Sequence, residues 1–348
     1  MTYDPAKGMF YGTTYAGETD MGAGTMFKYN PLTNTETVVY SFKGGLAASG
    51  GGSGPAAALT YDSANGMFYG TTYYNGTIFK YNPQTNAATV VYSFRETASR
   101  VALTYDPANG MFYGTIAQGG AKGNGTIFKF NPQTNAETVV YSFQGEPSKD
   151  GGFPRAALTY DPANKMFYGT TTRYGAAGNG TIFKFDPQTN TETVVHSFKT
   201  YGEGSGPVAA LTYDPANGMF YGTTSGGGTA FDGTIFKFNP QTNALTVVYS
   251  FGSVSGDGEY PHAAWIYDSG KGVYYGTTSG GGTSNAGTIF EFNPQTNAET
   301  VVYSFQGQPA DGKQPWAALT YDPANKTFYG TTRGGGADYD GTIFKFKP

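Results

Sequence analysis

The chain has 348 residues, with 53 glycines, no cysteine and a formal net charge of -4. The lack of cysteine excludes disulfides, thiol catalysis and thiolate-bound zinc. The acidic balance argues against nucleic-acid binding, which needs a clustered basic surface. No apolar run approaches the roughly 18 residues of a membrane-spanning helix.

A repeated pattern organises the chain from its first residues. In one complete unit, four strand-like runs follow each other: Ala209–Tyr213 (A), Met219–Thr224 (B), Gly233–Phe238 (C) and Leu245–Phe251 (D). They are rich in Thr, Val, Ile, Phe and Tyr, and Gly, Pro, Asn and Asp bound them, as is typical of strands. The Tyr-Asp pair that ends run A recurs at intervals of roughly 50 residues, at Tyr3, Tyr61, Tyr105, Tyr160, Tyr213, Tyr267 and Tyr321.

Four short antiparallel strands in each of seven units predict an all-β fold, a seven-bladed β-propeller of four-stranded blades. We expect a single domain over residues 1–348. Its units span approximately 1–44, 45–96, 97–145, 146–200, 201–253, 254–307 and 308–348. The last unit ends after run C, so one blade should have three strands. Lys345, Lys347 and Pro348 would then lie near a free edge, where charge and proline discourage pairing.

The succession "GTIFKFNPQTNALTVVYSF" (233–251), with "AALTYDPANGMFYGTTSGGG" (209–228), resembles the GloVer tandem-repeat proteins. These are bacterial exported proteins with propeller-like repeats, and the resemblance covers nearly the whole chain. It implies an extracellular or cell-surface location and a propeller-like array, and it brings no activity with it. The segment Met1–Phe10 does not have the pattern of a signal peptide.

The two ends of the predicted blades differ in sequence. In an antiparallel meander the A–B and C–D turns lie on one face, and the B–C and D–A connections lie on the other. The A–B turns repeat Asp-Pro-Ala-Asn-Gly, as at Asp106–Gly110, and the C–D turns repeat Asn-Pro-Gln-Thr-Asn, as at Asn131–Asn135. This is turn chemistry rather than a carboxylate ring. The other connections vary in length and composition, and variable loops on a rigid scaffold are where binding is usually found.

Residue types support this variable face as the binding face. Most aromatics occupy repeat positions and should fill the space between blades, with Trp265 replacing a strand-A leucine in the core. The other aromatics fall in B–C or D–A segments, and so does every arginine: Arg95, Arg100, Arg155, Arg173 and Arg333. Arginine and exposed aromatics are enriched at recognition surfaces.

Two places on the variable face are candidate ligand sites. The first is the entry to strand A, which should ring the mouth of the central channel if A is innermost, and which reads Ala56, Arg100, Arg155, Val208, His262 and Trp316. The second is a rim lowered by the short loops of the second unit, lined by Tyr73, Tyr74, Arg95, Glu96 and Arg100. The alternatives are a strand end that tolerates any residue and a simple deletion.

Catalytic and metal chemistry have little support. Of the two histidines, His196 stands where other units have Tyr and is interpreted as a packing substitute. His262 alone cannot form a His-rich metal site. We predict no catalytic residue, no metal site and no cofactor. A Ca²⁺ ion bridging carboxylates such as Asp150, Asp257 and Asp311 is a weaker alternative to ordinary turn chemistry.

Three functional hypotheses remain. The favoured one is a non-enzymatic extracellular binding module for a glycan, an anionic ligand or a protein, using the variable face. The second is a polysaccharide lyase or hydrolase with Arg100, Arg155 and His262 at the channel mouth. The third is a structural or assembly protein. The sequence predicts no nucleic-acid partner and no membrane span, and it leaves the oligomeric state open.

Overall fold

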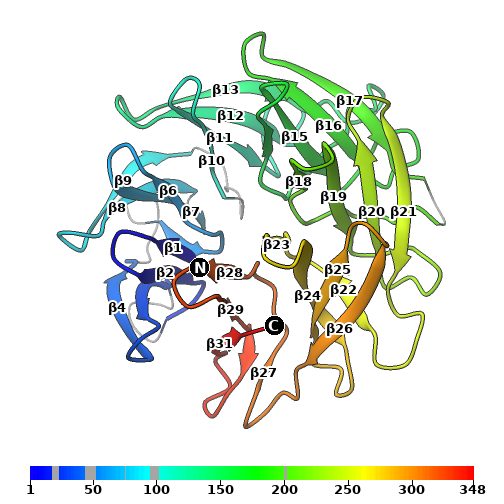
Figure 1. Cartoon of the computed structure of the whole chain (residues 1–348). Helices are drawn as coiled ribbons and strands as arrows, with labels where there is room; N and C mark the ends of the chain where they lie inside the picture. Colours follow the sequence, from blue (N-terminus) through cyan, green and yellow to red (C-terminus); the bar gives the residue numbers. More distant parts are fainter. Residues whose placement is uncertain (18–22, 44–51, 75, 95–101, 200–201) are drawn as a thin grey trace.

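The computed structural model describes residues 1–17, 23–43, 52–74, 76–94, 102–199 and 202–348. In this part of the chain every regular element is a β-strand, and no helix could cross a membrane. Figure 1 shows the strands grouped into blades around a central axis, with the N-terminus beside the last blade. The seven-bladed propeller predicted from the repeat is therefore confirmed, as is its three-stranded last blade.

Strands A to D form the blades in chain order. Blade 1 contains β1 (Thr2–Asp4), β2 (Met9–Thr14), β3 (Thr25–Asn30) and β4 (Thr35–Ser41). Blade 2 contains β6 (Thr60–Asp62), β7 (Met67–Tyr74), β8 (Thr77–Asn82) and β9 (Ala87–Ser93). Blade 3 contains β10 (Thr104–Asp106), β11 (Met111–Ile116), β12 (Thr126–Asn131) and β13 (Ala136–Ser142). Blade 4 contains β14 (Thr159–Asp161), β15 (Met166–Thr171), β16 (Thr181–Asp186) and β17 (Thr191–Ser197).

The remaining blades follow the same order. Blade 5 contains β18 (Thr212–Asp214), β19 (Met219–Thr224), β20 (Thr234–Asn239) and β21 (Ala244–Ser250). Blade 6 contains β23 (Ile266–Asp268), β24 (Val273–Gly281), β25 (Thr288–Asn293) and β26 (Ala298–Ser304). Blade 7 contains β28 (Thr320–Asp322), β29 (Thr327–Thr331) and β31 (Ile343–Phe346). Short strands in the loops are β5 (Ser53–Pro55), β22 (Gly258–Pro261), β27 (Gly312–Lys313) and β30 (Gly334–Gly335).

Aromatic side chains fill the space between neighbouring blades, as predicted. The ring of Tyr113 on strand B of blade 3 lies 4.7 Å from that of Phe167 in blade 4. The junction between the last and first blades repeats this contact, with Tyr329 and Phe10 at 4.6 Å. Trp265 is buried in the cluster between blades 5 and 6, as expected for a core residue. The propeller is thus a ring of similar hydrophobic junctions.

Strand A is the innermost strand, because the A strands of neighbouring blades contact one another. A threonine in strand A donates its hydroxyl to a strand-A carbonyl of the next blade. Thr104 Oγ1 lies 2.6 Å from the Leu158 oxygen, and Thr320 Oγ1 lies 2.6 Å from that of Met1. Blade 6 has Ile266 at this position and therefore no hydroxyl to donate toward blade 7.

The A–B turns are structural, as the sequence predicted. The buried Asp106 accepts the backbone N–H of Ala108 at 2.9 Å through Oδ1, and Asp161 does the same for Ala163 at 3.0 Å. Equivalent bonds recur in the other blades. Carboxylates used in this way close a turn and are not available on one face as a ring of ligands.

Candidate functional site

The variable face is built by each D–A segment lying between two B–C loops. At the start of blade 6, Tyr260 donates its backbone N–H to the Asp232 carbonyl of the preceding loop at 2.9 Å, and β22 pairs with β24 of its own blade. The same bond links Phe153 to Asn124, and Gln314 to Ala286. Because these residues are fixed on both sides by backbone pairing, the side chains at each junction stand on a rigid rim.

Exposed aromatic rings gather on this face. Among the described residues, eight aromatics are exposed. Two lie in repeat strands, Tyr267 in strand A and Tyr303 in strand D, and six come from B–C or D–A segments: Tyr15, Tyr74, Phe231, Tyr260, Trp316 and Tyr339. Toward the uniform face the exposed large apolar residues are Leu32, in a C–D turn, and Tyr267, beside an A–B turn. The predicted separation of the two faces therefore extends to the exposure of their side chains.

Two of the predicted channel-mouth residues are in contact. The His262 and Trp316 rings lie 5.5 Å apart, and the Arg333 guanidinium lies 4.7 Å from the centre of the Trp316 ring. Trp316 remains 43% exposed. Burial lowers the pKa of His262, so its ring is neutral near pH 7 and can accept or donate one hydrogen bond. Arg333 belongs to the arginines that the sequence places on the variable face, but sequence reasoning did not single it out as a ligand contact.

Arg155 stands exposed at the mouth position of blade 4, close in sequence to a second cation–aromatic group. The guanidinium of Arg173 lies 4.8 Å from the Phe153 ring, whose centroid is 6.2 Å from that of Tyr174. Residues 173 and 152 pair as an isolated bridge, so the B–C loop brings Arg173 to the D–A segment. Blade 4 thus repeats the arginine–aromatic arrangement of blade 7.

Tyr73 and Tyr74 end strand β7, with their rings 5.0 Å apart. Tyr15 from the B–C segment of blade 1 joins them, at 5.9 Å from Tyr74 and 6.5 Å from Tyr73. The structure therefore gathers three tyrosines at the junction of blades 1 and 2. The other three residues predicted for this sector, Arg95, Glu96 and Arg100, lie outside the described residues.

A polar arrangement at the outer edge was missed by sequence reasoning. The strand-D tyrosine Tyr141 donates its hydroxyl to Asp150 at 2.7 Å, and backbone N–H groups of Gln144 and Gly145 donate to the same carboxylate. Glu192 from strand D of the next blade faces this tyrosine, and burial raises its pKa to about 8. Tyr249, Asp257 and Glu299 repeat the group, where burial raises the pKa of Glu299 to about 7.

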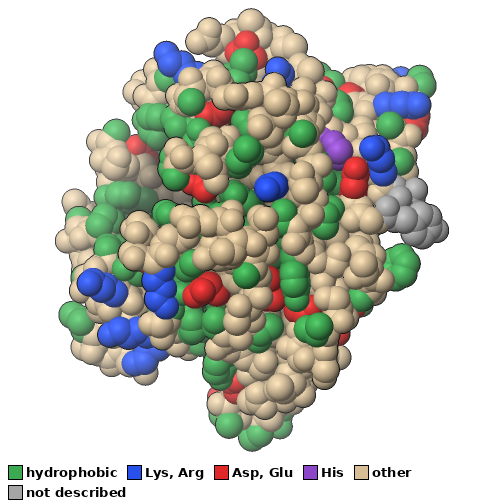
Figure 2. Space-filling model, turned by 45° about the vertical axis from the view of Figure 1, so that its right-hand side comes forward, with side chains coloured by type: hydrophobic (Ala, Val, Ile, Leu, Met, Phe, Trp, Pro, Cys, Tyr) green, Lys and Arg blue, Asp and Glu red, His purple; other side chains and the backbone are tan. Residues whose placement is uncertain are grey.

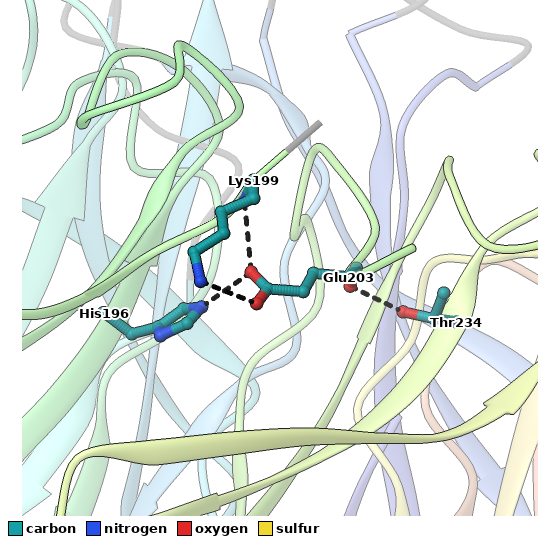
Figure 3. Close-up of polar contacts among 4 residues, drawn as sticks. All are labelled: His196, Lys199, Glu203 and Thr234. Atoms are coloured by element: carbon teal, nitrogen blue, oxygen red, sulfur yellow. Dashed lines mark hydrogen bonds and ion pairs between the residues drawn. The ribbon is translucent and has the colours of Figure 1, made fainter. Parts of the chain in front are cut away.

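Blade 4 varies this arrangement, as Figure 3 shows. His196 replaces the tyrosine, and its Nε2 lies 3.1 Å from Glu203 Oε2, while Lys199 contacts the same carboxylate through its backbone N–H and its ammonium group. The His196 ring also packs on Phe198 at 5.4 Å. His196 is therefore a packing substitute, as expected, and also a hydrogen-bonding one. Leu245 occupies the position of Glu192 on the next blade.

The described part of the chain contains no candidate metal-binding cluster. There, no three His, Asp or Glu side chains come together in a way that could hold a metal ion. On the surface drawn in Figure 2, Lys and Arg side chains lie in small groups among acidic and uncharged ones.

Fold and rim together define a seven-bladed β-propeller with a uniform face and a face of variable loops bearing exposed aromatics. The chain belongs to the Gloeobacter/Verrucomicrobia repeat family, whose model matches residues 98–274 and 256–348. No curated protein matches the chain significantly.

Solved structures share the fold at low sequence identity. The extracellular domain of a putative one-component system from B. thetaiotaomicron has a TM-score of 0.61 at 14% identity, covering 99% of this chain and 38% of that chain. A putative 6-phosphogluconolactonase from Bacteroides uniformis has a TM-score of 0.60 at 14% identity, covering 93% and 88%. A chain from a nidogen–laminin complex has 0.53 at 13%, covering 84% and 92%. These proteins have different functions by name, so the likeness concerns the fold.

Proposed function

We propose that the protein is a non-enzymatic module that binds a glycan outside the cell through its variable face. The observation that carries the proposal is the concentration of exposed aromatics on that face, six of the eight among the described residues. The repeat family suggests the location, and the similar extracellular domain is consistent with it.

The distribution of these rings favours a glycan over a protein partner. Tyr74, Tyr260 and Trp316 come from blades 2, 6 and 7, so these rings are spaced around the rim rather than fused into one apolar patch. A protein interface would need a central apolar core surrounded by a polar rim. A sugar ring instead offers one flat apolar face and a polar edge, which suits a single aromatic ring beside polar loop groups.

The group at blades 6 and 7 supplies the polar partners. Arg333, held over Trp316, presents planar N–H donors suited to hydroxyl or carboxylate oxygens. The neutral His262 ring beside Trp316 adds a hydrogen-bonding nitrogen. We assign the principal contacts to His262, Trp316 and Arg333, with Arg155 and the Tyr73–Tyr74 pair as further candidates around the rim.

The test is a glycan-array screen of the full chain, followed by titration calorimetry with the best ligand. Trp316→Ala should weaken binding roughly tenfold or more, the usual effect of losing an aromatic anchor. Leu32→Ala, on the uniform face, is the matched control and should leave affinity unchanged. Binding that Trp316→Ala leaves intact would refute this site, and the absence of any bound glycan would refute the proposed function.

A further inference from the structure

Several aromatics on the variable face have a backbone conformation that aromatic residues seldom adopt. Phe231 has φ of 68°, Tyr260 has 56° and Tyr339 has 69°. This left-handed region is unfavourable for bulky side chains and natural for glycine. The sister units show what the fold itself requires at these positions, because Gly178 aligns with Phe231 and Gly206 aligns with Tyr260. The rings are therefore unnecessary for the turn.

Two of these aromatics come from the two segments that are joined at the junction of blades 5 and 6. The backbone bond from Tyr260 to the Asp232 carbonyl places residue 260 beside Phe231 and Asp232. Both rings are open to solvent, with Phe231 61% and Tyr260 43% exposed. Neither ring fills the space between the blades, which Tyr221, Tyr274 and Phe292 fill below them. This pair is an exposed apolar surface on a rigid support.

Carboxylates flank the two rings. The Asp232 carboxylate is near enough to the Tyr260 hydroxyl to raise its pKa, and Glu259 precedes Tyr260 on β22. Burial, Asp232 and Asp257 together raise the pKa of Glu259, which reflects several acids close together. Among the described residues, neither Asp232 nor Glu259 has a cationic partner; the ion pairs found there involve Glu203. The junction between blades 4 and 5 instead has Asn179 and Ser205 at the two positions.

We propose that the blade 5–6 junction is a subsite for a protonated amino sugar, formed by Phe231, Asp232, Glu259 and Tyr260. The proposal rests on the glycan-binding function above and names the sugar class for one part of the same face. The rings accept the apolar face of the pyranose and attract the ammonium group through their π faces. The carboxylates receive the ammonium N–H groups in charge-assisted hydrogen bonds. Charge complementarity selects a cationic sugar here, whereas blades 4 and 7 present arginines.

The sister blades provide the test variant. Phe231→Gly, Asp232→Asn, Glu259→Ser and Tyr260→Gly together give this junction the residues of the blade 4–5 junction, which folds in the same chain. The full chain and this variant are titrated with a β-1,4-linked glucosamine oligosaccharide and with its N-acetylated counterpart of equal length. Thermal unfolding of both proteins checks that the fold is kept, and Trp316→Ala serves as the comparison at the neighbouring junction.

The expected result is that the full chain binds the glucosamine oligosaccharide at least about tenfold more tightly than the N-acetylated one, with the preference falling as salt rises. The exchanged variant should lose this preference and keep its unfolding midpoint. Equal affinity for the two oligosaccharides, or an exchanged variant that keeps the preference, would overturn the subsite while leaving the proposed function intact. If the array yields neutral glycans whose binding needs Trp316 and glucosamine is not bound, the subsite alone fails. If no glycan binds, both fail.

Discussion

Removing the charge-bearing group of Glu192 should stabilise the protein under alkaline conditions. The hydroxyl of Tyr141 has one proton and donates it to Asp150, which also accepts two backbone N–H groups. Glu192, on the other side of that hydroxyl, is buried and has an Oε1 atom without a hydrogen-bond partner. The protonated acid can donate to the tyrosine oxygen, whereas the carboxylate would face it and Asp150 with lone pairs alone. Burial is the main cause of the raised pKa of Glu192, and the negative charge of Asp150 adds to it.

The size of the effect follows from that pKa. A rise from the ordinary 4.5 to about 8, at about 1.4 kcal/mol for each tenfold step in proton affinity, limits the linkage to about 5 kcal/mol. Partial solvent access to Glu192 reduces this upper limit, and we expect Glu192→Gln to raise the free energy of unfolding at alkaline pH by about 1–2 kcal/mol. Since the folded-state pKa lies above the unfolded value, the contribution of Glu192 is full below about pH 4.5 and is lost as the pH rises toward 8. Glu192→Gln removes this loss.

The assay is urea unfolding of the wild type and Glu192→Gln at about pH 5 and about pH 9, bracketing the two pKa values. The two proteins should have similar midpoints in acid, and the variant should be the more stable in alkali. Asp338→Asn, in an exposed loop of blade 7, controls for the removal of one negative charge. An identical pH dependence of Glu192→Gln and wild type, or a destabilised variant at alkaline pH, would refute the reasoning.

Three further predictions concern the scaffold and are measured by thermal or urea unfolding. Thr104→Val removes an inter-blade hydrogen bond and should lower the free energy of unfolding by about 1 kcal/mol. Thr134→Val, in an exposed turn, should lower it little, and equal losses would contradict a stabilising role for the strand-A hydrogen bond between blades. Gly222→Ala would place a Cβ 2.5 Å from Phe236 Cζ and should cost about 1–3 kcal/mol, whereas Gly226→Ala, whose nearest neighbour is 3.2 Å away, should cost less. Tyr339→Gly should leave stability unchanged or raise it by up to about 1 kcal/mol, and a clear loss would mean that the ring supports the fold.

The propeller could be predicted from the sequence because every level of the repeat indicates the same structure. The turn sequence at Asp106–Gly110 closes A–B hairpins, and alternating apolar residues such as Ile127 and Phe128 point to the two sides of each blade. The last unit, which ends after strand C, likewise predicted the three-stranded blade. Its strand β31 is half-buried where strand C of other blades is buried, because no outer strand covers it.

The placement of the candidate residues could be predicted in part. Residue types predicted that surplus aromatics gather on the face of variable loops, and aligned positions put His262 and Trp316 at equivalent places in neighbouring blades, where their rings are in contact. The left-handed aromatics were also within reach, since Phe231 aligns with Gly178 and Asn285, residue types that favour positive φ. The Tyr141–Asp150–Glu192 group was not, because its members come from two blades and a loop, and their approach depends on the rotation between neighbouring blades.

Blade 7 combines two features that make it the least anchored part of the ring. Its sheet has three strands where the sheets of the other blades have at least four, and the blade before it has Ile266 where the others have a hydroxyl-bearing threonine. In a ring of similar junctions, stability is set by nearest neighbours, and opening starts at the weakest contact. Local unfolding should therefore begin by detachment of this blade. Amide protons of β28 and β29 would then exchange with solvent earlier than those of β14 and β15, while the remaining blades persist as an open arc.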